Sequence, residues 1–593
     1  MIKLFQRMTK REYAMVLCSL VFIVAQVWLD LKMPDYMSTI TTLVETPGSE
    51  ISEILLNGGY MLLCAVGSMA AAMITGFFAA KVAAGLSKSL REGMFKKVMR
   101  FNSEEMGRFS TASLITRTTN DITQVQMLIA MGLQAIIKAP ILLVWAVVKI
   151  AGKQWQWSVA TAGAVLVILI VLVIAIVLAL PKFQIIQKLT DQLNRVTREN
   201  LTGIRIVRAY NAEQYQEKKF EQANEELTST NLFANRVLAL LMPTMTFVTS
   251  GISLAIYWIG AYLIDAAEMT QRLSLFSDMV VFSSYALQVI MAFTMLTMMF
   301  IMLPRVLVSV RRINEVLDTE ISIRDGIIME EMDTTWKNKI HGGKIEFRNV
   351  SFRYPDAGNY ALEDISFTAD AGETVAIIGS TGSGKSTLVN LIPRFYDVTD
   401  GEILIDGMNV KTYTMKTLRN KLGYVSQRAV LFSGTVESNV AYGENGHPTP
   451  EADTVMRAVS LAQASEFVEK MDGKLEARIA QGGSNVSGGQ KQRLSIARAI
   501  CRNPEIYIFD DSFSALDYKT DRILRSALNR ELSGATKLIV AQRIGTIRNA
   551  NKIIVLDDGK IAGTGTHDEL MRSCTVYQEI ARSQLSEEEL NYA

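Results

Sequence analysis

The chain has 593 residues, a formal net charge of +2 and a hydrophobic content of 49%, which leaves room for more than one domain. The nearly balanced charge gives no basis for nucleic-acid binding, so we expect no nucleic-acid partner. The chain has only three histidines, and its four cysteines lack metal-like spacing, so no zinc site is predicted.

Most of the apolar sequence lies in the first 310 residues. Six stretches are long enough to cross a bilayer: 14–31, 58–80, 125–148, 159–180, 237–264 and 275–303. The fourth stretch carries no charge along its length, so buried helices of a soluble protein do not explain the set. We therefore predict a multi-pass protein with the lipid bilayer as a partner.

Basic residues predict the orientation of these spans. The amino end carries Lys3, Arg7, Lys10 and Arg11, and the loop after the second span carries Lys88, Arg91, Lys96, Lys97 and Arg100. The connection 35–57 has four acidic residues and no Lys or Arg. Because basic loops stay on the cytoplasmic side, the amino end is predicted to be cytoplasmic and the acidic connection external. No cleavable signal is apparent, since the first thirteen residues are polar and basic.

The predicted cytoplasmic connections are unusually long. They cover about 45 residues from position 81 and about 55 from position 181, with helix-forming composition. At about 1.5 Å per residue, the membrane helices would continue about 30 Å or more beyond the bilayer. We expect the transmembrane domain at 1–310, a charged linker at 311–342 that includes Glu330 and Glu331, a second domain at 343–585, and an acidic, solvated tail at 586–593.

The second domain begins with a phosphate-binding pattern. The hydrophobic run 374–378 leads into a G-x-x-x-x-G-K-[ST] segment: Gly379, Ser380, Thr381, Gly382, Ser383, Gly384, Lys385, Ser386 and Thr387. The glycines let backbone N–H groups surround the phosphates, Lys385 meets the outer phosphates, and the Ser386 hydroxyl binds Mg²⁺. Asp510 ends the apolar run 506–509, where its carboxylate can hold the Mg²⁺ shell. The ligands predicted from these residues are a nucleoside triphosphate and Mg²⁺.

The order of the segments in 343–585 resembles that of the ATP-binding cassette. Tyr354 resembles the aromatic residue on which adenine stacks, and Gln427 resembles the loop glutamine that touches Mg²⁺ and the transmembrane part. Ser487, Gly488, Gly489 and Gln490 resemble the signature motif, which in this family caps the ATP of the opposite cassette. Asp517 closes 514–517, which resembles the D-loop. The resemblance implies a dimer with two shared ATP sites.

Six spans followed by one cassette resemble an exporter half-transporter of this family. The implied fold is an α-helical transmembrane domain, with six spans and long cytoplasmic extensions, fused to an α/β P-loop ATP-binding cassette domain. The segments 109–117 and 203–211 resemble the two coupling regions. The implied activity is an ATPase coupled to export, in a bacterial plasma membrane, with the nucleotide-binding domain in the cytoplasm.

Two positions depart from the family pattern. Asp511 stands where the family usually has the general-base Glu, and Gln542 stands at the switch histidine. Asp withdraws the carboxylate by roughly 1 Å, which can cost about a hundredfold in rate. An amide donates hydrogen bonds, but it carries neither charge nor a transferable proton. The catalytic candidates Asp511, Gln542 and Gln427 therefore predict a site that holds ATP and cuts it slowly.

An altered catalytic site together with an intact signature motif resembles the degenerate-site subunit of heterodimeric bacterial multidrug exporters. The run 481–485 strengthens the likeness, because homodimeric exporters usually carry Glu-Arg-Gly there. The resemblance implies a partner half-transporter with Glu and His at the positions of Asp511 and Gln542, whose competent site the intact signature completes. A homodimeric exporter of lipid or peptide, and a nucleotide-gated channel or regulator, are the alternatives.

The substrate is less well defined by sequence. The last span carries Met291, Met295, Met298 and Met302 at helical spacing, which suits varied apolar ligands or ordinary packing. Asp278 and Gln288 lie in the same span, and Lys138 lies in the third span, where it either lines a cavity or pairs with another chain. A small hydrophobic or amphipathic drug is the expectation from the family.

Overall fold

The computed structural model describes residues 6–46, 48–151, 153–329, 342–355, 357–444 and 448–584. The chain divides into two compact units. The first comprises Met1–Met99 and Ser110–Thr319, and the second comprises Arg100–Phe109 and Glu320–Ala593. Glu330, Glu331 and the acidic tail of the sequence analysis lie outside the described residues.

The first unit is helical. Its helices are α2 (Lys10–Glu45), α3 (Ile51–Val98), α5 (Thr111–Thr116), a π-helical turn (Arg117–Asp121), α6 (Ile122–Ala151), α7 (Trp155–Thr202), α8 (Ile204–Ala209), α9 (Glu213–Ala239), α10 (Leu241–Ala266) and α11 (Met269–Asp318). Six helical stretches of the described residues are long and apolar enough to span a membrane, which confirms the six predicted spans. Helix α11 continues through residues 311–318 of the predicted linker.

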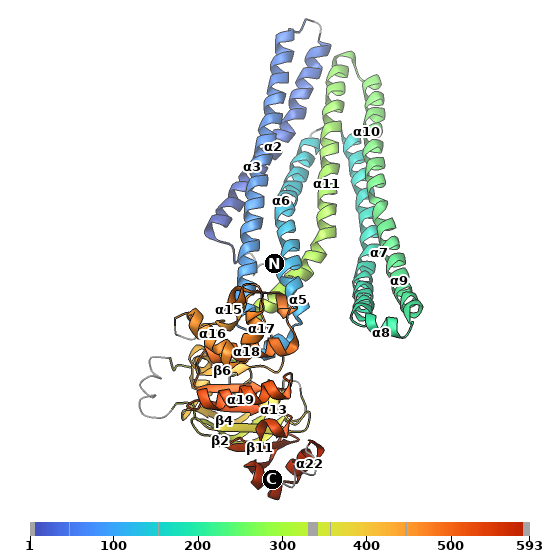
Figure 1. The fold of residues 1–593 in the computed structure, drawn as a ribbon. Helices are drawn as coiled ribbons and strands as arrows, with labels where there is room; N and C mark the ends of the chain where they lie inside the picture. The colour runs from blue at the N-terminus through green and yellow to red at the C-terminus, as the bar shows by residue number, and fades with distance from the viewer. Residues whose placement is uncertain are drawn as a thin grey trace. The chain divides into compact units, whose positions relative to one another are not determined.

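The membrane helices extend well past the bilayer, as predicted. Helices α3 and α7 each contain 48 residues, or about 72 Å at about 1.5 Å per residue. The hydrocarbon core of a bilayer is only about 30 Å thick. The ends of α7 and α9 lie side by side and are joined by the short helix α8 (Figure 1). Apolar residues of α7 such as Val173 and Val177 are exposed, as a lipid-facing surface requires.

The core of the first unit draws residues from α2, α6, α7, α10 and α11. Trp157 is fully buried there, and its ring centroid lies 5.4 Å from that of Phe282. Its indole N–H donates to the Ile256 carbonyl oxygen at 3.2 Å, which satisfies the only polar atom of the ring. This contact fixes the start of α7 against α10 and α11.

The described residues of the second unit form twelve strands and a set of short helices. The strands are β1 (Ile345–Phe352), β2 (Leu362–Ala369), β3 (Thr374–Gly379), β4 (Asp400–Ile405), β5 (Met408–Asn409), β6 (Leu422–Val425), β7 (Gly434–Thr435), β8 (Arg478–Ile479), β9 (Ile506–Asp510), β10 (Thr536–Val540), β11 (Lys552–Asp557) and β12 (Lys560–Gly565). The helices are α4 (Ser103–Arg108), α13 (Lys385–Leu391), α14 (Met415–Asn420), α15 (Val436–Val440), α16 (Ala452–Leu461), α17 (Ser465–Glu469), α18 (Gly488–Cys501), α19 (Tyr518–Glu531), α20 (Ile544–Ile547), α21 (His567–Ser573) and α22 (Thr575–Gln584), with 3₁₀ turns at Val410–Thr412, Lys474–Glu476 and Gln481–Gly483.

A six-stranded sheet organises this unit. Its strand order is β12-β11-β3-β10-β9-β6, and all neighbours are parallel except the edge strand β12. Every residue of β9 and β10 is buried, because apolar clusters cover both faces of the sheet. A smaller sheet in the order β2-β1-β4-β5 pairs antiparallel throughout.

Helix α4 belongs to the second unit although it lies between membrane helices in the sequence. Glu105 explains this placement in part, because its carboxylate accepts a hydrogen bond from the backbone N–H of Ser322 at 2.7 Å. The same carboxylate caps α4 by accepting from the Asn102 N–H at 2.7 Å. The ring of Phe101 also stacks on Phe109, with centroids 5.9 Å apart. The first predicted coupling region, 109–117, therefore begins at the edge of the cassette unit.

Candidate functional site

Four neighbouring parallel strands deliver the nucleotide-site candidates to one edge of the six-stranded sheet. The glycine-rich loop follows β3, Gln542 follows β10, Asp510 ends β9, and Gln427 follows β6. Val540 pairs with both Ile377 and Asp510 in the strand register. Because the carboxyl ends of parallel strands meet at one edge, residues far apart in sequence become neighbours there.

The glycine-rich loop has the backbone geometry of an anion cradle. Gly382 and Gly384 have φ values of 89° and 96°, which favour glycine, and α13 begins at Lys385 directly after them. Lys385 is buried, and its Nζ donates to the carbonyl oxygens of Gly379 and Ser380 at 2.9 and 2.6 Å. Burial lowers the pKa of Lys385, while the charges of Asp511 and Asp510 oppose the shift. The glycine-rich loop, the start of α13 and the buried Lys385 ammonium group together form a site that suits a phosphate group.

Two oxygen ligands of the kind that Mg²⁺ prefers meet beside this loop. The Ser386 hydroxyl donates to Asp510 Oδ1 at 2.9 Å. Burial raises the pKa of Asp510, and the neighbouring charge of Asp511 adds to the increase. A divalent cation would stabilise a carboxylate in this setting, so the oxygen pair fits the predicted metal role.

Asp511 is held in a fixed orientation. Its φ is 46°, in the left-handed region, and its backbone N–H donates to the Val540 carbonyl oxygen at 3.0 Å. The side-chain amides of Gln427 and Gln542 both donate to Asp511 Oδ2, at 3.3 and 2.9 Å. Burial raises the pKa of Asp511. The hydrogen bond from Gln427 and the positive charges of Lys385 and Arg543 oppose this shift. The three catalytic candidates of the sequence analysis therefore lie together.

Tyr354 lies next to the helix that follows the glycine-rich loop. Its hydroxyl is 2.9 Å from the Thr387 hydroxyl, and its ring packs edge-on against Phe352 and Tyr396, with centroids 4.9 and 5.3 Å away. The position beside the loop suits the predicted contact with the base of a nucleotide.

The signature and D-loop residues cap helices. Ser487 and Gln490 form a capping box at the start of α18, with Gln490 Oε1 accepting from the Ser487 N–H at 2.8 Å. Asp517 caps α19 by accepting from the Thr520 N–H at 3.0 Å, and this bond lowers the Asp517 pKa. A Cβ on Gly489 would lie 3.2 Å from the Ala515 carbonyl oxygen, so the two segments pass close together. The hydrogen bonds that Ser487, Gln490 and Asp517 make are local to their own helix starts.

The first unit has a polar cluster between its spans. Lys138 of α6 forms an ion pair with Asp30 of α2, with 3.0 Å between Nζ and Oδ2. The hydroxyl of Ser68 also donates to Asp30, and Gln288 Nε2 donates to the Asp30 carbonyl oxygen at 3.3 Å. Lys138 was predicted either to line a cavity or to pair with a carboxylate of another chain. Its partner is instead a carboxylate of the same chain. The fold brings α2, α3, α6 and α11 together around this ion pair.

Asp278 and the methionine stripe also have described surroundings. Asp278 Oδ1 lies 2.5 Å from Lys153 Nζ, and Lys149 Nζ lies 2.7 Å from Asp35 Oδ2. Met291 is 63% exposed, Met295 packs against the apolar core, and Met302 is half-buried. The Met298 side chain lies outside the described residues. The stripe therefore does not form one uniform surface.

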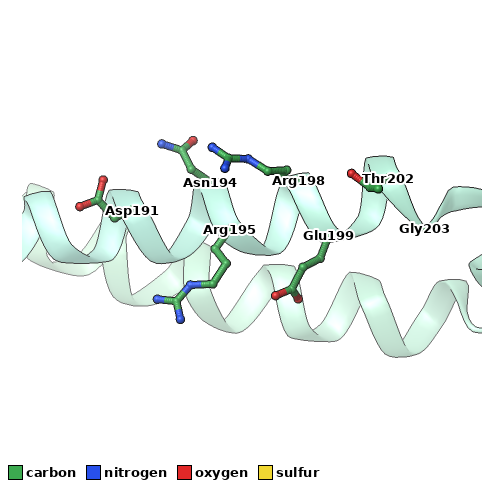
Figure 2. A pocket seen from close by; sticks show the side chains of 7 residues that line it. All are labelled: Asp191, Asn194, Arg195, Arg198, Glu199, Thr202 and Gly203. Carbon is green, nitrogen blue, oxygen red and sulfur yellow. The ribbon is translucent and has the colours of Figure 1, made fainter. Parts of the chain in front are cut away.

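A surface groove of about 640 Å³ lies on the cytoplasmic extension of α7. Its lining residues are Asp191, Asn194, Arg195, Arg198, Glu199, Thr202 and Gly203. Figure 2 shows Arg195 and Glu199 pointing toward the neighbouring helix, while Asn194 and Arg198 point away from it. Glu199 pairs there with Lys219 of α9 at 3.0 Å. The groove holds none of the nucleotide-site candidates.

Comparisons with known proteins cover nearly the whole chain. A family model described as ABC transporter matches residues 362–514, and one described as ABC transporter transmembrane region matches residues 16–293. An uncharacterized ABC transporter ATP-binding protein of Mycobacterium bovis is 39% identical over 535 residues, covering 89% of this chain and 87% of the relative. The chain belongs to the ABC transporter family.

Further similar proteins include one whose printed name gives a substrate and one of known structure. An ATP-dependent lipid A-core flippase of Aromatoleum aromaticum is 31% identical over 512 residues, covering 86% of this chain and 82% of the relative. A bacterial Atm1-family ABC exporter with ATP bound has the same fold, with a TM-score of 0.77, 24% identity, and coverage of 98% of this chain and 100% of the other.

These findings confirm several predictions about the chain. It is an ABC exporter half-transporter, an ATPase coupled to export, and a multi-pass inner-membrane protein with a cytoplasmic nucleotide-binding domain. Exporters of this family bind ATP and work as dimers in the membrane.

Sequence reasoning missed two residues around the site. The Ser514 hydroxyl donates to the Asp511 carbonyl oxygen at 2.9 Å and helps to fix its unusual backbone. The Arg543 charge acts on Asp511 from the position after Gln542. Both lie inside segments that the motifs had marked, but the motifs assign no role to them.

Proposed function

We propose that this exporter works as a heterodimer in which its own glycine-rich loop, Asp510 and Asp511 form the slow, nucleotide-retaining site. The observation that carries the proposal is the pair of amides on Asp511 Oδ2. They fix a carboxylate that is one methylene shorter than the usual Glu, in a site with an amide at the switch position. Such a site orients ATP well but places its base about 1 Å too far from the attacking water.

In this proposal each nucleotide-site residue has a stated task. The glycine-rich loop and Lys385 bind the phosphates, Ser386 and Asp510 hold Mg²⁺ with help from Gln427, and Tyr354 stacks on adenine. Mg²⁺, when bound, neutralises charge that develops on the phosphates during cleavage. Asp511 accepts a proton from the attacking water, while Gln542 keeps the carboxylate in place.

The partner half-transporter is proposed to carry Glu and His at the positions of Asp511 and Gln542. This chain's signature, from Ser487 to Gln490, then completes the partner's competent site, and Asp517 lies in the loop that crosses between the two sites. ATP binding draws the cassettes together, and the coupling regions 109–117 and 203–211 transmit the displacement to the spans. ATP shifts that equilibrium only by its differential affinity for the closed dimer.

The proposed substrate is a small amphipathic or hydrophobic compound. The exposed Met291 is a flexible, polarizable side chain on the last span. The similarity to lipid A-core flippases makes a homodimeric lipid exporter the second candidate function. A lipid substrate and a drug substrate share an apolar body with a polar end, so the two candidates differ mainly in partner and cargo.

The test is ATP hydrolysis and substrate accumulation in inverted vesicles that contain this chain with and without the half-transporter encoded by the adjacent gene. We expect transport to require the partner and to survive Asp511→Ala with a modest loss. If the chain pumps alone and Asp511→Ala abolishes pumping, the homodimer is correct. ATP-dependent conductance without accumulation against a gradient would instead identify a channel. Lipid and dye cargoes are compared in the same vesicles.

A further inference from the structure

We propose that Gln584, the last residue of α22, is a positioning residue that holds the switch loop so that Gln542 reaches Asp511. This inference rests on the proposed role of Gln542 and assigns a positioning role to helix α22 of the cassette. The Gln584 side chain forms two hydrogen bonds to the loop backbone. Its Nε2 donates to the Gln542 carbonyl oxygen at 2.7 Å, and its Oε1 accepts from the Ile544 N–H at 2.9 Å.

This pair of bonds brackets the switch residue. One primary amide uses a donor and an acceptor on two backbone groups, so the positions of 542 and 544 are fixed relative to α22. On the other side of the loop, the Ala541 N–H donates to the Ile377 carbonyl oxygen of β3 at 3.1 Å. Gln542 is therefore held between the strand that leads into the glycine-rich loop and the carboxyl-terminal helix.

Helix α22 provides a firm support for this contact. Tyr577 and Ala581 are fully buried, and the Tyr577 hydroxyl lies 2.8 Å from His567 Nδ1. The helix packs against α20, β3 and β11. Because buried side chains anchor the helix one and two turns before its end, the Gln584 backbone is constrained even though its side chain is exposed.

A second clamp on this region acts at different residues. Arg525 of α19 donates to the carbonyl oxygens of Gly545 and Thr546, both at 3.0 Å, and also pairs with Asp521. These bonds hold the start of α20. They do not hold the Gln542 carbonyl group, whose hydrogen bond comes from Gln584.

The consequence is a chain of contacts from α22 to the reacting carboxylate. Gln584 fixes the Gln542 backbone, and the Gln542 side chain donates to Asp511 Oδ2 at 2.9 Å. Gln584 itself is not proposed to touch ATP. Its removal should loosen the alignment of Asp511 without changing the groups that bind the nucleotide.

The test compares variants of the assembled full-length transporter in liposomes, by single-turnover ATP hydrolysis with protein in excess. The variants are Gln584→Ala, Gln542→Ala, the double variant, and Gln578→Ala as the matched control. Gln578 lies on the same helix, and its Nε2 donates to the Met571 carbonyl oxygen at 2.8 Å, so its loss weakens the attachment of α22 without touching the switch loop. Melting temperatures monitor folding.

We expect Gln542→Ala to lower the single-turnover rate of this chain's site, measured at saturating protein concentration, about tenfold, and Gln584→Ala to lower it about threefold to fivefold. The protein concentration that gives half the maximal rate should stay unchanged in both. In the Gln542→Ala background, Gln584→Ala should have no further effect, since the side chain that it positions is gone. Gln578→Ala should leave the rate unchanged.

The outcomes separate this inference from the proposed function. If Gln542→Ala leaves the rate unchanged, the proposed role of Gln542 fails and this inference fails with it. If Gln542→Ala slows the site while Gln584→Ala behaves like Gln578→Ala, only the inference is overturned. Equal slowing by Gln584→Ala in both backgrounds also overturns it, because a purely structural effect of α22 adds independently of the Gln542 side chain.

Discussion

Lengthening the base by one methylene is the most direct test of the slow site. Asp511→Glu moves the carboxylate outward by about 1 Å, the displacement for which a misplaced catalytic group costs about a hundredfold. The Asp511 carboxylate already meets two amides at 2.9 and 3.3 Å. The longer residue can reach the attacking water because these donors are on flexible glutamine side chains. We expect the slow rate to rise about a hundredfold, which corresponds to a decrease of about 2.7 kcal/mol in the activation free energy.

The assay is single-turnover ATP hydrolysis by the full-length transporter in liposomes, where this chain's site gives the slow phase. Asp511→Asn is the matched control, since it keeps the size and the acceptor oxygen but removes basicity, and it should fall below the wild-type rate. An unchanged or lower rate for Asp511→Glu, with ATP still bound, would refute carboxylate length as the limiting factor.

Three other predictions follow from single contacts. Lys138→Met leaves the charge of the Asp30 carboxylate without its ion-pair partner among the spans. The transporter in detergent should therefore lose about 3 kcal/mol of stability, measured by thermal melting. Adding Asp30→Leu to the same chain should restore most of that stability. Ser386→Ala removes a proposed Mg²⁺ ligand and should raise the Mg²⁺ needed for half-maximal ATP hydrolysis about tenfold, whereas Ser386→Thr should not. Burial lowers the pKa of His567, and the Arg548 charge lowers it further. Neutral His567 therefore stabilises the fold above about pH 6.5, and this stability is lost as the pH falls through the lowered pKa. The melting temperature should fall with pH over this range, and if the same fall persists in His567→Phe, the histidine is not its origin.

The elements with strong local signals were predicted from the sequence. Residues 159–180 carry no charge and are almost entirely apolar, which suits a bilayer, and the six spans were predicted by the same criterion of length and apolar composition. The glycine-rich loop was equally clear, because its glycines are needed for backbone angles that other residues rarely adopt. Both signals are contained within one short stretch of chain.

The remaining features depend on contacts between distant residues. Nothing near Lys138 in the sequence identifies Asp30, 108 residues earlier, as its partner. The convergence of Gln427 and Gln542 on one oxygen of Asp511 depends on the order of β6, β9 and β10 in the sheet. Gln584 lies 42 residues beyond Gln542 in an ordinary amphipathic helix. A single sequence contains no local pattern for such pairings.

The Asp30–Lys138 pair also has a consequence for the biogenesis of the protein. A charged residue at the centre of a membrane helix costs about 2.5 to 3.5 kcal/mol on insertion, and Asp30, one residue before the end of the predicted span 14–31, costs less than that. The partner of Asp30 is 108 residues further along the chain, which at about 5 to 20 residues per second is synthesised roughly 5 to 20 seconds later. During that interval α2 must stay in the bilayer through its own apolar residues, with its carboxylate unpaired. The arrival of α6 neutralises that charge, so pairing of these two helices favours early assembly of the bundle during translation.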